Sequence, residues 1–176
     1  MAAGPHPRLP RGAVERRLFV DAPPDVVWAA LHDPSCPTWR DVRLHLDPAG
    51  PDWPAAGARR HARFRMGPIV VGITLESLEA RPARRFRVGI DGRGICGERR
   101  WELTPAAGGT RVAGSVRLEG CSRVGRVFLR LDRAGIGPRL EAELAALKEK
   151  AEAATGRPTS PSLQRRDAEP HGRSLR

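Results

Sequence analysis

The chain has 176 residues, of which 40% are hydrophobic, and its formal net charge is +11. That length suits one domain with a sizeable core, and the apolar content excludes a chain that is disordered throughout. No apolar run approaches the ~20 residues that span a bilayer, and the first residues lack the apolar stretch of a signal peptide, so we expect a soluble, cytoplasmic protein.

The positive charge is spread along the chain. Residues 1–17 and residues 155–176 carry +3 each, which leaves +5 for the middle. Lysine is rare and arginine abundant, which is typical of a GC-rich genome and weakens the charge as an argument for a polyanionic partner. The ends are rich in Pro, Gly, Arg and Ser without periodicity, so we predict disordered tails at 1–11 and 155–176 around a domain at 12–154.

The three cysteines lie far apart in the sequence. Cys36, Cys96 and Cys121 include no CxxC pair and are odd in number. This pattern favours a reducing compartment over a disulfide framework. We therefore expect Cys96 and Cys121 to be small buried residues.

The first elements are a strand and a short helix. Apolar residues alternate over 13–20 and predict a strand. Pro24 suits the first position of a helix, Asp25 favours its positive end, and the Asp33-Pro34 pair ends it. The segment at 35–41 can form only a turn or a second short helix before another strand near Val42–Leu46.

Alternation of apolar and charged residues predicts five further strands, with turn residues between them. Consecutive short strands of this kind form an antiparallel meander with one buried and one solvated face. Here the solvated face is strongly basic. The predicted strands are Ala58–Met66, Ile69–Leu78, Arg84–Ile90, Ile95–Leu103 and Thr110–Leu118.

A long helix is predicted over 122–154. Ser122 can cap it, and Pro138 should bend or interrupt it. The apolar residues at helical spacing, which would cover the sheet, are Val124, Val127, Phe128, Leu131, Leu140, Leu144 and Leu147. The predicted fold class is α+β, with a curved antiparallel sheet of six to seven strands wrapped around this helix and two short helices after the first strand.

This order of elements resembles the SRPBCC superfamily, whose START-domain and Bet v 1-like members share the helix-grip fold, and within it the polyketide cyclase/dehydratase-like branch. The matching segments are FVDAPPDVVWAALHDP followed by Trp39, LESLEARPARRFRV, WELTPAAGGTRV and RLEAELAALKEKAE. None of them is a catalytic signature. The resemblance implies a cavity between sheet and helix that holds a lipid, polyketide, sterol or quinone.

Inward-facing aromatic and aliphatic residues are the candidates for the wall of that cavity. Such side chains can enclose a planar apolar ligand, and the alternative for each of them is ordinary core packing. The candidate ligand-binding residues are Trp28, Trp39, Phe64, Met66, Ile73, Phe86, Val88, Ile90, Arg99, Trp101, Leu118, Phe128 and Leu131.

Arg99 is the most informative of them, because alternation places it on the same face as Trp101, where an unpaired charge is costly. It can meet a bound anion or an inner carboxylate, or reach water where the strand frays. Arg60 faces inward by the same reasoning, but it lies near the start of its strand, where the alternative that it reaches water is the stronger one. Two inward arginines would favour a ligand with an acidic or enolate-like oxygen.

No established catalytic or metal motif is present. Among the histidines, His61 falls on the solvated face, and His32 at the helix end beside Asp33 is expected to be solvated. No HExxH, CxxC pair, P-loop or nucleophile elbow occurs, so we assign no metal, no cofactor and no catalytic residue.

The leading hypothesis is binding or transport of a small hydrophobic ligand by a protein with no enzymatic activity or a weak one, with Arg99 as a possible polar anchor. The alternative is an aromatic polyketide cyclase or dehydratase, which needs an inner acid–base pair that the sequence does not locate. A third hypothesis is a basic surface module for nucleic acid, an anionic membrane or a protein partner. The solvated face lacks exposed aromatics for stacking bases, which disfavours nucleic acid, whereas weak contact with an anionic membrane is compatible with it. The residues of that face are Arg59, Arg63, Arg65, Arg85 and Arg87.

Overall fold

The computed structural model describes residues 12–33, 44–66 and 69–156. Its strands are β1 (Val14–Val20), β2 (Leu44–Leu46), β3 (Arg59–Met66), β4 (Ile69–Arg81), β5 (Arg85–Gly92), β6 (Ile95–Ala106) and β7 (Gly109–Gly120). Its helices are α1 (Pro24–His32) and α2 (Arg123–Ala154). The expected second short helix and the expected N-terminal tail lie outside the described residues, as does the expected C-terminal tail beyond residue 156.

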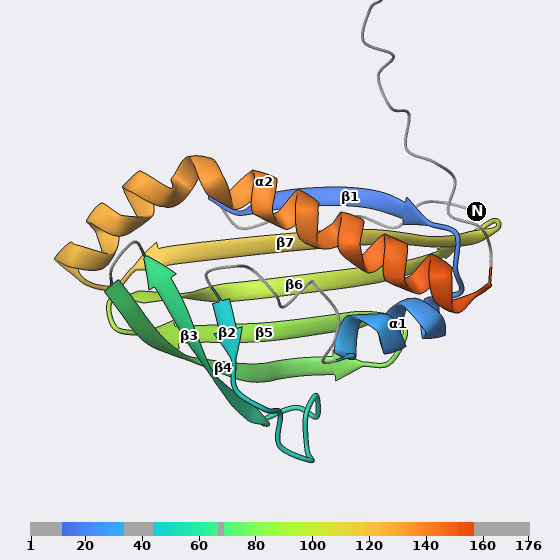
Figure 1. Ribbon diagram of the computed structural model, residues 1–176, viewed down its shortest axis with the longest axis horizontal. Coiled ribbons are helices and arrows are strands. Elements are labelled where there is room, and N and C mark those ends of the chain that lie inside the picture. The colour runs from blue at the N-terminus through green and yellow to red at the C-terminus, as the bar shows by residue number, and fades with distance from the viewer. Residues whose placement is uncertain (1–11, 34–43, 67–68, 157–176) are drawn as a thin grey trace, which may run out of the picture.

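The seven strands form one antiparallel sheet in the order β1-β7-β6-β5-β4-β3-β2. Strands β2 to β7 are joined as a meander, and β1 pairs with β7 at the far edge. Glycines with positive φ, Gly94 and Gly108, lie in the turns on either side of β6, a conformation that glycine adopts without steric cost. The sheet curls, and α2 lies along its concave side (Figure 1).

Helix α2 begins where the sequence predicted, directly after Ser122. The hydroxyl of Ser122 accepts the N–H of Gly125 at 3.0 Å and caps the first turn. The helix then runs for 32 residues with Pro138 inside it. It is bent but not interrupted (Figure 1). Its second half presents the buried Leu140, Leu144 and Leu147 to the sheet.

The predicted alternation holds on the central strands. On β5 the buried residues are Phe86 and Val88, and on β6 they are Arg99, Trp101 and Leu103. Helix α1 adds Val27, Ala30 and Leu31 to the same core. The predicted helix-grip arrangement is therefore present.

The expectation for the cysteines is wrong. Cys96 and Cys121 form a disulfide, with their Cα atoms 6.2 Å apart. Antiparallel pairing explains the contact, because Cys96 lies opposite Glu119 near the end of β7 and the chain then turns back at Cys121. Sequence separation of 25 residues hid this proximity. Among the helices of the described residues, none is both long and apolar enough to cross a membrane.

Candidate functional site

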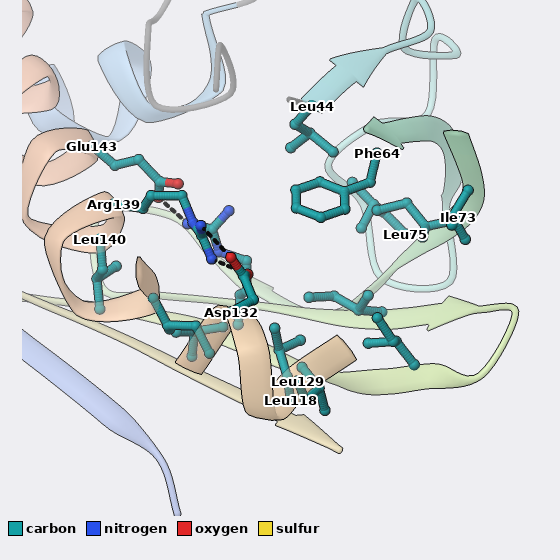
Figure 2. Close-up of a pocket in the computed structure, with 16 residues that line it drawn as sticks. Leu44, Phe64, Ile73, Leu75, Leu118, Leu129, Asp132, Arg139, Leu140 and Glu143 are labelled. Carbon is teal, nitrogen blue, oxygen red and sulfur yellow. Dashed lines mark hydrogen bonds and ion pairs between the residues drawn. The ribbon is translucent and has the colours of Figure 1, made fainter. Parts of the chain in front are cut away.

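A cavity of about 120 Å³ lies between the concave side of the sheet and α2 (Figure 2). Strands β2 to β7 each contribute at least one inward-facing side chain, and α2 closes the opposite wall. The lining residues are Leu44, Phe64, Val71, Ile73, Leu75, Ile90, Ile95, Arg99, Val116, Leu118, Leu129, Asp132, Ile136, Arg139, Leu140 and Glu143.

Twelve of the sixteen lining residues are apolar and four are charged, and the charged ones occur as two ion pairs. Arg99 of β6 reaches across to Glu143 of α2, and Arg139 pairs with Asp132 one heptad earlier on the helix. Nη1 of Arg139 donates to Oδ1 of Asp132 at 2.9 Å. Figure 2 shows Asp132, Arg139 and Glu143 gathered on the helix side of the cavity, with Leu44 and Phe64 facing them.

Glu143 is the partner of the inward-facing Arg99. The two side chains are only 11% and 13% exposed, so each charge needs its partner in this apolar setting. The guanidinium carbon of Arg99 also lies 4.9 Å from the ring centre of Trp101, a cation–π contact. An inner acid, rather than water at a frayed strand, meets the arginine.

Sequence reasoning missed Asp132, Arg139 and Glu143. A signal for them was present, because residues 7 and 11 positions after Asp132 return to the same face of a helix. That face also carries Ile136 and Leu140, which line the cavity. The charges were hidden because a charged residue on a long helix usually faces water.

Five of the predicted ligand-binding residues line this cavity: Phe64, Ile73, Ile90, Arg99 and Leu118. The side chains of Met66 and Phe128 are not described, and Trp39 lies outside the described residues.

Other predicted wall residues form an aromatic core beneath α1 instead. The ring of Phe86 stacks on Trp101 at 5.7 Å and meets Trp28 edge-on at 6.0 Å. Phe86, Val88 and Trp101 are no more than 1% exposed. These residues therefore belong to the packed core and do not line the cavity, because α1 fills the space over that part of the sheet.

The placement of Leu131 in the cavity wall is wrong. Its side chain is 78% exposed, and Val124 and Val127, also predicted to cover the sheet, are 63% and 59% exposed. In the first half of α2, Leu129 and Ile136 instead face the cavity. Leu131 lies about 200° around the helix from Leu129, so it points away from the sheet.

His32 is more buried than expected. Its ring lies 4.2 Å from the ring of Trp28 and 4.6 Å from that of Phe86, and Nδ1 is 2.9 Å from the carbonyl oxygen of Trp28. Burial lowers the pKa of His32 below its usual value of 6.5. His61, in contrast, is exposed, as predicted.

Arg60 is buried, as its alternation predicted, but it does not line the cavity. The Nε of Arg60 donates to the carbonyl oxygen of Asp47 at 2.7 Å, so this donor has a hydrogen-bond partner within the protein. Burial lowers the pKa of Arg60. Within the part of the chain that the structure describes, no group of three or more His, Cys, Asp or Glu residues could hold a metal ion.

The basic outer face of the sheet carries matching carboxylates. Arg87 binds Glu98 through two hydrogen bonds of 2.7 and 2.9 Å. This contact raises the pKa of Arg87 and lowers that of Glu98. Further pairs join Arg59 to Glu76, Arg63 to Asp47 and Arg85 to Glu102. Most of the charge that the sequence placed on this face is therefore neutralised locally.

Three solved structures illustrate what the fold is similar to. A protein of Thermus thermophilus is 22% identical, with a TM-score of 0.62 over 81% of this chain and 99% of its own. A protein of Nitrosomonas europaea is 14% identical, with a TM-score of 0.62 over 85% of this chain and 99% of its own. An aromatase/cyclase from Streptomyces sp. R1128 is 16% identical, with a TM-score of 0.60 over 81% of this chain and 94% of its own. At these identities the likeness concerns the fold.

Sequence comparison adds the family. No curated protein sequence matches the chain significantly. The model of the family described as polyketide cyclase/dehydrase and lipid transport matches residues 11–152, which include every described strand and nearly all of α2. The chain therefore belongs to this SRPBCC-type family.

Proposed function

We propose that the protein binds a small hydrophobic molecule in the cavity between the sheet and α2. The observation that carries this proposal is the cavity wall, in which apolar side chains from six strands and one helix surround a few paired charges. Ligand sites in proteins are typically apolar concavities with a small number of placed polar groups. The family description, which includes lipid transport, supports the same function.

The dimensions of the cavity suggest what enters it. Its volume of about 120 Å³ is close to that of an apolar cavity of ~150 Å³ that accommodates benzene. A cavity of this volume holds one ring or a branched alkyl group of the ligand. The Arg99–Glu143 pair offers a donor and an acceptor, so the buried end of the ligand carries at most a carbonyl or hydroxyl oxygen.

Filling the cavity tests the proposal. Leu118→Trp places an indole in the wall, whereas Leu78→Trp adds the same group at a position that is 43% exposed. We expect Leu118→Trp to weaken binding of the neutral probe 1-N-phenylnaphthylamine at least tenfold and Leu78→Trp to leave it unchanged, measured by fluorescence titration. Circular dichroism melting curves establish that both variants are folded. Equal probe binding by all three proteins would exclude this cavity as the site.

A cyclase or dehydratase is the second candidate, favoured by the two carboxylates that line the cavity. In such a reaction Glu143 takes a proton from a carbon between two carbonyls, and the carbanion attacks a third carbonyl to close a ring. The alkoxide that forms takes the proton back from Glu143, and the new hydroxyl then leaves as water together with the remaining proton of the carbon that attacked. The Streptomyces aromatase/cyclase of the same fold supports this reading. Mass spectrometry should show a product lighter by one water from a synthetic poly-β-ketone, formed by the native protein and not by Glu143→Gln. No product from the native protein would reject chemistry on this substrate class.

A further inference from the structure

The first half of α2 presents an apolar stripe to solvent. Val124, Val127 and Leu131 are 63%, 59% and 78% exposed. At 100° per residue their side chains fall within about 60° of one another, so they form one stripe along two turns. Contiguous exposed apolar side chains rimmed by polar residues are a feature of protein and membrane interaction sites.

Arginines border the stripe on one side. Arg123, Arg126, Arg130 and Arg133 are all exposed and occupy a sector of about 80° next to the apolar residues. Asp132 is the one carboxylate in the sequence from 122 to 134, and its side chain is held at the cavity by Arg139. This surface, the stripe with its four arginines, therefore keeps a strong positive charge.

The second half of α2 has neither an exposed apolar stripe nor a row of arginines. Its outward positions mix acidic Glu141 and Glu149 with Lys148, and none of its large apolar residues is among those exposed in the described chain. Figure 1 shows the first half, in orange, at the outer edge of the fold. Leu129 and Ile136, on nearly the opposite side of the same turns, line the cavity. One helical segment thus separates the cavity from whatever the stripe contacts.

We propose that this surface docks on an anionic lipid bilayer. Charge complementarity identifies the partner, since a helix with an apolar stripe beside a row of arginines lies in the interface of a bilayer with its cationic groups among anionic headgroups. Docking brings the helix wall of the cavity against the membrane. This surface is distinct from the outer face of the sheet, where carboxylates neutralise the arginines.

Vesicle sedimentation with the full chain tests the proposal. At ~0.15 M salt the protein should pellet with vesicles of phosphatidylcholine that also contain phosphatidylglycerol and remain in the supernatant with phosphatidylcholine alone. Val127→Glu with Leu131→Glu should lower the partition coefficient at least tenfold. Arg126→Gln with Arg130→Gln should lower it roughly thirtyfold, because each arginine near an anionic surface contributes about a fivefold effect. These two arginines are exposed, so this pair tests the proposal even where the glutamate variant fails to fold.

Matched controls locate the effect on the helix. Val70→Glu changes an apolar residue of β4 that is 54% exposed, and Arg84→Gln with Arg111→Gln removes two exposed arginines that lie in the β4–β5 turn and on β7. Both controls should bind vesicles nearly as the native chain does. Absent or lipid-independent binding, or losses as large in the controls, would overturn the proposal. So would a dimer, seen by sedimentation velocity, that Leu131→Glu dissociates while vesicle binding is unchanged, since that would assign the stripe to a second copy.

Discussion

Arg99 and Glu143 place opposite charges in a wall that is otherwise mostly apolar. Each side chain is nearly buried, so their mutual attraction offsets a large desolvation cost. Such a pair adds little net stability compared with two apolar residues, but either residue alone is costly. Its retention beside an apolar cavity is consistent with a role in orienting a ligand.

Removing one charge should therefore be worse than removing both. Arg99→Met leaves the carboxylate of Glu143 without the arginine that neutralises it, and we expect the free energy of unfolding to fall by at least about 2 kcal/mol. The double variant Arg99→Met, Glu143→Leu should recover most of that loss. Urea denaturation of the three proteins checks this. A double variant as unstable as the single one would show that packing, rather than charge, dominates at this contact.

His32 should make stability depend on pH. Because burial lowers its pKa, the unfolded chain takes up a proton at a higher pH than the folded chain does. The stability that neutral His32 contributes is thus complete above its usual pKa of 6.5 and is lost as the pH falls through its folded-state pKa. Between about pH 7.5 and about pH 5.5, His32→Phe should lose less stability than the native chain. The exposed His61→Gln should behave like the native chain, and identical pH profiles of all three would contradict the prediction.

At the scale of elements, α2 depends on two close approaches to the sheet. Gly114 of β7 has no side chain, so Leu140 and Leu144 pack directly over its backbone. At the start of the helix, Gly125 lies against Gly94 in the turn between β5 and β6, so closely that a Cβ atom would overlap its carbonyl oxygen. These contacts fix where α2 begins and how deeply it sits in the sheet.

Two glycines of α2 should respond oppositely to alanine. Gly135→Ala gains helix propensity, and the nearest atoms to its Cβ are at the movable end of Arg139, at 2.8 Å, and on Asp132, at 3.5 Å, so stability should rise by up to about 1 kcal/mol. Gly125→Ala gains the same propensity but pushes the helix off a fixed backbone, so we expect a loss of about 2 kcal/mol. Thermal unfolding monitored at 222 nm by circular dichroism compares them, and a gain for Gly125→Ala would disprove the close approach.

At the scale of the whole molecule, the arginines of the described residues lie on surfaces of different character. On the outer face of the sheet, arginines pair with carboxylates of neighbouring strands, as in Arg59–Glu76 and Arg87–Glu98. On the first half of α2, four arginines stand beside exposed valine and leucine. The composition gives only the net charge of the chain, whereas the fold decides which positive charges remain available to an anionic partner.

The sequence by itself determined the element order, the antiparallel meander, the capped and bent helix, and the inward direction of Arg99. These features follow from local rules, since alternation of period 2 and helical spacing are set by neighbouring residues. Residues such as Phe64, Ile73 and Leu118 reached the cavity for the same reason.

Only the tertiary structure decided which inward residues line a cavity and which pack against α1. It also placed Glu143 opposite Arg99, joined Cys96 to Cys121, and turned Leu131 outward. Each of these depends on contacts between residues far apart in the chain, or on the rotation of a long helix about its axis. Neither is fixed by local pattern, because the face that a helix buries is set by the shape of the sheet that receives it.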